Sequence, residues 1–258
     1  MTSTNADAPE GSTTPAAAAV RKRHRMVDRV AAILESVARS SEGLTLTDLA
    51  RTLDAPVSSI QGLVNGLIAT GYLEERERRY FLGTAPYLLN LIVGRRMVTR
   101  VTPTELENIS AETGLTTLLA IAVGSDVFYI DSCTSEARYE YLSKNLVRRS
   151  LIRTSSGWVL LSGMPQRDLW AYLSSRPPED EELVERFLRA LGDIRETGLC
   201  AGPQISDIAD GVSAAVHEDG RLVATVSVVG SSETITARRD DLVDVLRRHK
   251  ARWDGNQV

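Results

Sequence analysis

Hydroxyl and amide side chains gather on one side of residues 57–71, VSSIQGLVNGLIATG. The apolar residues recur at i, i+3, i+4, i+7 and i+8, which predicts an amphipathic helix with one buried stripe. Gln and Asn hydrogen-bond to base edges in the major groove, and Ser binds bases or phosphates, so the outer face fits DNA. A surface helix with an ordinary polar face is the alternative. The stripe is Ile60, Leu63, Val64, Leu67 and Ile68, and the outer face is Ser58, Ser59, Gln61, Gly62 and Asn65.

The residues before this helix predict the remainder of a helix-turn-helix. Apolar positions from Met26 to Val37 indicate a first helix. Thr45 and Asp48 then have the spacing of a capping box, which opens a short helix that carries Thr47 toward DNA. Residues 54–56, Asp-Ala-Pro, form the turn into the next helix. This order of helix, short helix, turn and amphipathic helix is that of a helix-turn-helix.

Basic residues lie on both sides of the helix-turn-helix. Residues 72–75 and 79–82 predict two strands of a wing, and Arg76 and Arg78 at its tip are candidate contacts to the DNA backbone. Ahead of the first helix, the run RKRHR contains Arg23 and Arg25, which are expected to reach phosphates or a minor groove. A solvated terminus is the alternative. Residues 21–83 carry ten basic and eight acidic side chains in a chain of net charge −4, so this part is the positive one.

The composition of the 258 residues, 43% hydrophobic and 25% charged, is that of a globular protein. Residues 1–20 read as a disordered tail. The apolar runs are too short for a membrane helix and the N-terminus has no signal pattern, so we expect a cytoplasmic protein. Cys133 and Cys200 lack metal-binding spacing, and no histidine lies in a catalytic motif. We therefore expect no metal, no cofactor and no enzyme.

The remaining chain divides into a connecting helix and a second domain. Residues 84–101 predict a linker helix with an apolar face, and packing of this helix on its own domain is the alternative. Residues 102–258 group their strands at both ends of a set of helices, which indicates a central antiparallel sheet with helices packed on it and an α+β chain overall. The apolar face of the linker helix consists of Leu88, Leu89, Ile92, Val93 and Met97.

Residues 26–83 resemble the winged helix-turn-helix of IclR-type bacterial transcriptional regulators. The matching segments are RMVDRVAAILESVA, LTLTDLARTLDAPVSSIQGLVNGLIATGYLE and RRYFLG. The family's recognition helix usually runs Ser-Thr-aliphatic-X-Arg-Leu-Leu, whereas this chain has SSIQGLV, with Gly62 in the place of the Arg. Gly66 lowers helix propensity by roughly another 1 kcal/mol and would permit a close helix crossing. The resemblance implies a DNA-binding domain at 21–83 and a linker helix that helps to form a dimer.

Residues 104–253 resemble the effector domain of the same family, which has a GAF-like α/β fold. Residues 150–161, SLIRTSSGWVLL, look like the family's small-residue run before a helix, with Trp158 in the place of the usual Lys. Residues 211–216 and 222–230 look like its closing hairpin. The resemblance places an effector pocket between that helix start and these strands. The candidate contacts are Thr154, Ser155, Ser156, Gly157 and Ser227.

The residue types around this helix start favour an organic acid. Exposed N–H groups and the positive end of a helix dipole suit an anion, and Arg153 would add a bidentate contact to a carboxylate. Trp158, Tyr129 and Tyr141 offer flat apolar walls. A solvated basic patch and ordinary core packing are the alternatives.

These features together predict a ligand-responsive transcriptional regulator without enzymatic activity. We expect it to bind double-stranded, palindromic operator DNA as a homodimer or homotetramer. A small organic acid, aromatic acids included, would bind the C-terminal domain and change the DNA affinity through the linker helix. The competing hypothesis is a winged-helix protein whose C-terminal domain only oligomerises.

Overall fold

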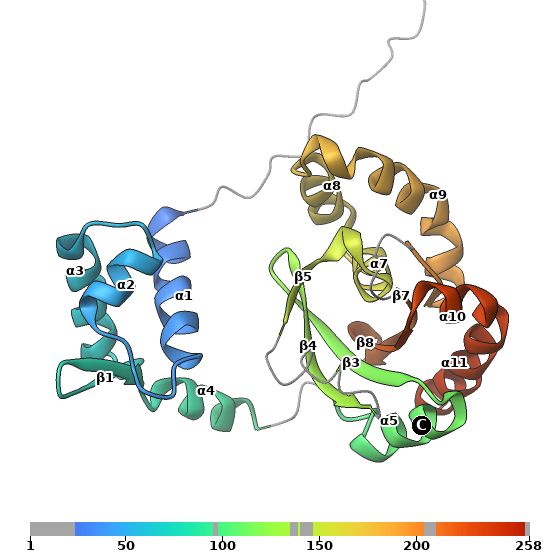
Figure 1. The fold of residues 1–258 in the computed structure, drawn as a ribbon, viewed down its shortest axis with the longest axis horizontal. Coiled ribbons are helices and arrows are strands. Elements are labelled where there is room, and N and C mark those ends of the chain that lie inside the picture. The colour runs from blue at the N-terminus through green and yellow to red at the C-terminus, as the bar shows by residue number, and fades with distance from the viewer. Residues whose placement is uncertain (1–23, 95–97, 135–138, 140–146, 204–209, 256–258) are drawn as a thin grey trace, which may run out of the picture. The chain divides into compact units, whose positions relative to one another are not determined.

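The computed structural model describes residues 24–94, 98–134, 139, 147–203 and 210–255 (Figure 1). The chain divides into two compact units, one formed by Arg21–Met97 and the other containing Val98–Val258. Arg23, Met97 and Tyr141 lie outside the described residues. None of the helices in these described ranges has the length and apolar character needed to cross a membrane.

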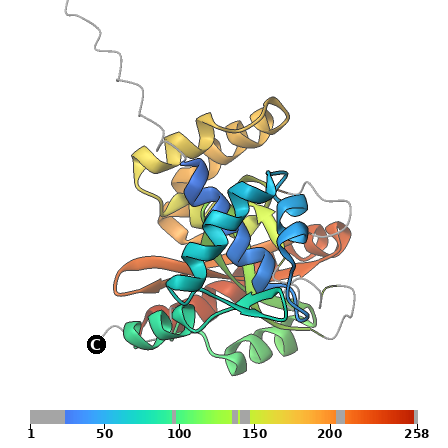
Figure 2. The same cartoon turned by 90° about the vertical axis from the view of Figure 1, so that its left-hand side faces the viewer.

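The first unit is a winged helix-turn-helix (Figures 1 and 2). Its three helices surround a small core that includes Ile33, Leu49, Ile60 and Val64, each fully buried. A two-stranded hairpin and a fourth helix follow. The elements are α1 (Arg25–Ala38), α2 (Leu46–Thr52), α3 (Val57–Ala69), β1 (Leu73–Arg76), β2 (Arg79–Leu82) and α4 (Ala85–Val93).

Local chemistry explains where these elements begin and turn. The predicted capping box is confirmed, because Thr45 Oγ1 accepts from the Asp48 N–H at 3.2 Å and Asp48 Oδ2 accepts from the Thr45 N–H at 3.1 Å. Glu77 and Arg78 join β1 to β2 with φ of 51° and 63°. Positive φ at both central residues is the backbone that a two-residue hairpin turn needs, so the predicted wing forms.

The linker helix is shorter than predicted. α4 ends at Val93 because Gly94 takes a left-handed conformation with φ of 67° and caps the helix C-terminus, so the expected extension to residue 101 is wrong. None of its residues is buried within the described part of the chain. Its large apolar side chains are 49–70% exposed, and they are Tyr87, Leu88, Leu89, Leu91, Ile92 and Val93.

A six-stranded antiparallel sheet forms the centre of the second unit, with strand order β5-β4-β3-β8-β7-β6. The expectation of a central antiparallel sheet is confirmed. The strands are β3 (Thr116–Val123), β4 (Asp126–Cys133), β5 (Arg148–Ser150), β6 (Leu199–Cys200), β7 (Asp210–Glu218) and β8 (Arg221–Gly230). The helices are α5 (Pro103–Thr113), η1 (Leu151–Arg153), α7 (Ser155–Ser162), α8 (Gln166–Ser174), η2 (Pro178–Asp180), α9 (Glu181–Thr197), α10 (Ser232–Ala237) and α11 (Arg239–Asp254).

Each face of the sheet carries its own hydrophobic core. On one face α7, α8 and α9 pack over Leu118, Ala120 and Ala215. On the other face α5 and α11 cover Val212, Val226 and Val228. Alternate residues of one strand therefore serve opposite faces, as the period of two in a strand requires. β7 and β8 have buried residues on both faces, so these two strands connect the two cores.

Candidate nucleic-acid interface and ligand site

The exposed face of α3 matches the predicted DNA-reading face at its centre. Ser58, Gly62 and Asn65 are exposed, whereas Gln61 is half-buried on one flank. Gln61 Nε2 donates to Asn65 Oδ1 at 2.8 Å, so the two amides hold each other across one helical turn. The pairing uses the Gln61 NH₂ and the Asn65 carbonyl, so the Gln61 carbonyl can still accept from a base edge and the Asn65 NH₂ can still donate to one. The predicted apolar stripe is confirmed, with Ile60, Val64 and Leu67 buried.

The opposite flank of α3 is occupied by a side chain that the sequence analysis did not select. Arg29 of α1 donates from Nη1 to Ser59 Oγ at 3.2 Å. Arg29 follows the helical pattern of α1 like any other polar position, so nothing in the sequence marks it. A Cβ built on Gly62 or Gly66 meets no atom within 4 Å. The suggested close helix crossing at Gly66 is therefore absent among the described residues, and this part of the face is open.

The four other candidate DNA contacts that the structure describes lie on the surface of the same unit. Arg25 is the first residue of α1 and is exposed, and Thr47 is exposed in the first turn of α2. Arg76 pairs with Glu74 and places its guanidinium 5.3 Å from the Phe81 ring centroid, which fixes it along the wing. Arg78 is exposed at the wing tip.

The N-terminus of α7 lies against β7 and β8, as the sequence analysis expected. Thr154 is the N-cap, and its Oγ1 accepts from the Gly157 N–H at 2.9 Å. Thr154 thus satisfies one of the free N–H groups of the first turn, and it is a capping residue in this structure. The adjacent serines of α7 turn their side chains toward the sheet.

Four buried serines form one hydrogen-bonded cluster between α7 and the sheet. Ser213 Oγ donates to Ser155 Oγ at 2.7 Å and shares a second bond of 2.7 Å with Ser227 Oγ. Ser227 Oγ is also 2.7 Å from Ser156 Oγ. All four side chains are buried. Four hydroxyl hydrogens serve three bonds here, so one hydroxyl hydrogen remains to donate to another acceptor.

The sequence analysis named three of these serines and missed Ser213. Ser213 faces α7 from the apolar stretch 212–216 of β7, and a polar residue at a buried strand position was the available signal. Asp210 is a second missed residue. It is buried, and its carboxylate accepts from the Ser232 hydroxyl at the start of α10.

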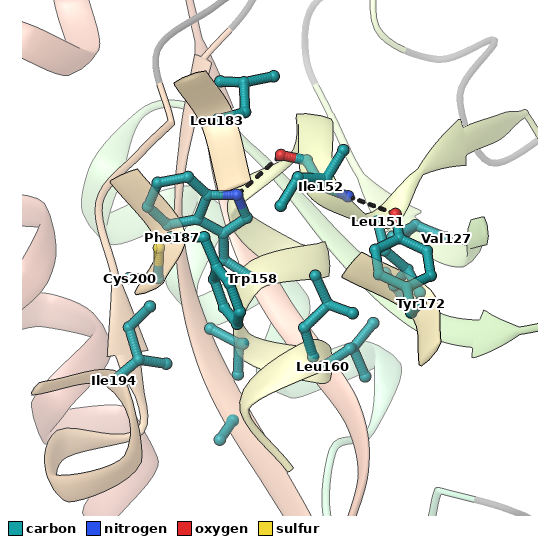
Figure 3. Packing of buried hydrophobic residues seen from close by; sticks show 14 of the residues in the cluster. Val127, Leu151, Ile152, Trp158, Leu160, Tyr172, Leu183, Phe187, Ile194 and Cys200 are labelled. Atoms are coloured by element: carbon teal, nitrogen blue, oxygen red, sulfur yellow. Dashed lines mark hydrogen bonds between the residues drawn. The ribbon is translucent and has the colours of Figure 1, made fainter. Parts of the chain in front are cut away.

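Gly157 and Trp158 have structural roles, and Figure 3 shows the packing around Trp158. A Cβ on Gly157 would lie 1.9 Å from the Leu151 carbonyl oxygen, so glycine lets η1 and α7 touch. Trp158 is 4% exposed and donates from Nε1 to the Ile152 carbonyl at 2.8 Å. Its ring meets Phe187 edge-on at 5.6 Å between centroids. Trp158 and Phe187 therefore belong to the core on the α7 side, where Tyr129 is also buried.

Arg153 has a protein partner. Its Nη2 is 2.5 Å from Oδ1 of Asp180, whose side chain is 3% exposed at the end of η2. A buried carboxylate without a cation would be costly, so this pair ties η1 to η2. The sequence analysis assigned Arg153 to a ligand carboxylate. It did not identify Asp180 as a partner, because Asp180 is 27 positions away in the sequence.

Two family models match the chain. Residues 26–77 match the IclR helix-turn-helix domain, and residues 91–252 match the bacterial transcriptional regulator IclR C-terminal domain. A curated relative, the HTH-type transcriptional regulator TtgV of Pseudomonas putida, is 22% identical over 192 residues, which are 73% of each protein.

Solved structures have the same fold. An IclR homolog from Microbacterium hydrocarbonoxydans, complexed with 4-hydroxybenzoate, aligns over 89% of this chain and 98% of its own, with a TM-score of 0.66 and 21% identity. An IclR family transcriptional regulator from Brucella abortus aligns over 92% and 94%, with a TM-score of 0.67 and 18% identity. The α+β fold class is confirmed. The C-terminal model alone spans more than half of the sequence, and the chain belongs to the IclR family of bacterial transcriptional regulators, with a helix-turn-helix DNA-binding domain and a C-terminal effector domain.

Proposed function

We propose that the protein is a one-component regulator that binds a palindromic operator as a homodimer or homotetramer and responds to a small organic acid. The observation that carries the ligand part is the buried serine cluster, Ser155, Ser156, Ser213 and Ser227, at the N-terminus of α7. Its spare hydroxyl hydrogen and the positive end of the helix both favour an acceptor that carries negative charge.

The acid is proposed to bind by displacing hydrogen bonds inside this cluster. A serine hydroxyl rotates about its Cβ–Oγ bond, so a carboxylate oxygen that enters between α7 and the sheet can accept from two such hydroxyls. All four serines are buried, so this proposal requires α7 to move away from β7 and β8 to admit the acid. Arg153 stays bound to Asp180 in this proposal and supports η1 from outside. The 4-hydroxybenzoate found in the Microbacterium hydrocarbonoxydans homolog makes aromatic acids the first compounds to test.

On the DNA side, α3 is the proposed recognition helix and the wing follows the backbone. Ser58, Gln61 and Asn65 would read bases, while Arg25 and Arg78 would contact phosphates. Helix-turn-helix proteins read half-sites about 34 Å apart in pairs, so the apolar side chains of α4 are assigned to a second copy of the chain.

The test is a thermal-shift screen of the full-length protein with 4-hydroxybenzoate, benzoate, phenylacetate, catechol, glyoxylate and pyruvate. A bound compound at about 100 times its dissociation constant stabilises the fold by roughly 2.7 kcal/mol. Ser213→Ala and Ser227→Ala should remove the shift, and Ser174→Ala, an exposed serine at the end of α8, should keep it.

Two results would change the proposal. A compound whose affinity survives both cluster substitutions binds elsewhere. A flat response over the whole panel favours the second candidate function, in which the C-terminal domain only oligomerises.

A further inference from the structure

The chain that enters the second unit is held by one carboxylate. Residues 98–101, the connector, follow α4 and lead into α5. Glu218 Oε1 accepts from the Thr99 N–H at 2.6 Å and from the Arg100 N–H at 2.9 Å. The Thr99 hydroxyl adds a bond of 2.9 Å to Oε2, and Arg100 Nε lies 3.6 Å from Oε2. A single side chain thus fixes two consecutive amides of the connector.

A second attachment leads from the connector back to β7. Arg100 Nη1 donates to the Trp253 carbonyl at the end of α11 at 2.8 Å. The Trp253 indole donates from Nε1 to the Ala215 carbonyl at 3.2 Å. Ala215 is two positions from Ser213 on the same strand. The connector is therefore linked to β7 both at the end of the strand and at its middle.

Glu218 is the last residue of β7, and Arg221 opposite it is the first residue of β8. The same two strands carry Ser213 and Ser227 of the serine cluster. Glu218 lies five positions after Ser213, which is about 17 Å along a strand at 3.4 Å per residue. The pairing of β7 with β8 shifts register between Val216 and His217, which lie on this path. Such an irregularity increases the local twist of the strands, so a change of twist at the serine cluster would deform the strand pair most easily at this point, beside Glu218.

The surroundings of Glu218 favour the ionised carboxylate that accepts from the connector amides. Partial burial raises the pKa of Glu218, but the N–H groups of Thr99 and Arg100, the Thr99 hydroxyl and the Arg100 charge outweigh this effect, so its pKa lies below the ordinary value. The carboxylate therefore stays ionised at neutral pH. Arg100 Nε is buried and lacks a well-directed hydrogen bond within the described residues, which leaves this attachment incomplete.

We propose that Glu218 is a positioning residue that relays the state of the serine cluster to the connector, and through it to the DNA-binding unit. The regulatory meaning of this contact rests on the proposed function, because the cluster is the proposed effector site. With the carboxylate bound, the connector has one fixed geometry. A ligand that twists β7 against β8 would shift the equilibrium toward a released connector.

The deciding experiment measures amide hydrogen exchange of the full-length protein by mass spectrometry on peptides that cover residues 98–102. Glu218→Gln should speed exchange of the Thr99 and Arg100 amides by about tenfold, since a hydrogen bond to a charged group stabilises by more than a neutral one. Glu107→Gln, an exposed glutamate on α5, is the matched control and should leave these amides unchanged. Ser227→Val, which breaks two bonds of the cluster, should also speed their exchange.

The relay predicts that the two effects do not multiply. In the double variant, Ser227→Val should add nothing at residues 98–102 beyond Glu218→Gln. Independent, multiplicative effects would overturn the proposal, and so would a Ser227→Val protein that changes exchange in β7 and β8 but not in the connector. If Ser227→Val fails to fold, Ser213→Ala provides the same comparison. The measurement needs neither ligand nor DNA, so a flat ligand screen and a failed relay are separate results.

Discussion

Position 62 offers a direct test of the open face of α3. Gly62 is exposed in the middle of the helix, and an added Cβ meets no atom within 4 Å. Any ordinary side chain there removes the entropic cost of glycine without a clash. We therefore expect Gly62→Ala and Gly62→Arg each to raise the free energy of unfolding by about 0.5–1 kcal/mol.

The two substitutions differ in charge. Gly62→Arg places a cation where the IclR-type recognition helix, by resemblance, usually has an arginine, three positions after Ser59, which accepts from Arg29. One more phosphate contact should steepen the slope of log affinity against log salt by about one unit, with tighter binding at low salt. Gly62→Ala changes no charge, so its salt slope should equal that of the unmodified protein.

Urea unfolding measures the first effect, and anisotropy titration of a short random-sequence duplex over a series of salt concentrations measures the second. If Gly62→Ala destabilises the protein, the space beside Gly62 is not open and the geometric argument is wrong. If both variants lose DNA affinity, the DNA backbone approaches α3 so closely that position 62 must be glycine. The absence of an arginine at this position then does not amount to a lost phosphate contact.

Three further predictions concern the wing, α4 and the α5–α11 contact. Arg78→Gly keeps the positive φ of the wing turn and removes only the charged side chain. The DNA affinity should therefore fall equally on operator and random DNA, and the slope of log affinity against log salt should flatten by about one unit. A loss confined to the operator would contradict a phosphate contact. Ile92→Glu puts a charge on the most exposed apolar residue of α4, and sedimentation should show dissociation to monomers. Asn90→Glu on the same helix should leave the oligomer intact. If the unmodified protein is a monomer, the assignment of α4 to a second copy of the chain is wrong. Hydrogen bonds from His249, then from Arg248, lower the pKa of Glu112, so this carboxylate stabilises the fold at higher pH and the stabilisation is lost as pH falls through its folded-state pKa. Glu112→Gln should therefore flatten the acid limb of stability against pH below about pH 5, and an unchanged limb, judged against Glu107→Gln, would show that the contact is absent in solution.

Much of the DNA-binding unit followed from the sequence because its signals are local. The capping box at Thr45, the stripe from Ile60 to Ile68 and the wing depend on residues within a few positions of one another. Helix propensity, side-chain caps and amphipathic spacing act at that range, so pattern alone determined these elements. The end of α4 also had a local signal, Gly94, which was outweighed by the apolar periodicity that continues past it.

Only the tertiary structure decided which side chains meet. Asp180 pairs with the guanidinium of Arg153, and the Ile152 carbonyl accepts from the indole N–H of Trp158. Two residues that were expected to contact a ligand therefore have partners within the protein. Ser213 joins Ser155 from 58 positions away, and Glu218 reaches Thr99 from 119. Buried polar groups must find partners wherever the fold brings them, and sequence spacing carries no information on partners so distant. The serine cluster and the connector anchor are therefore properties of the packed sheet.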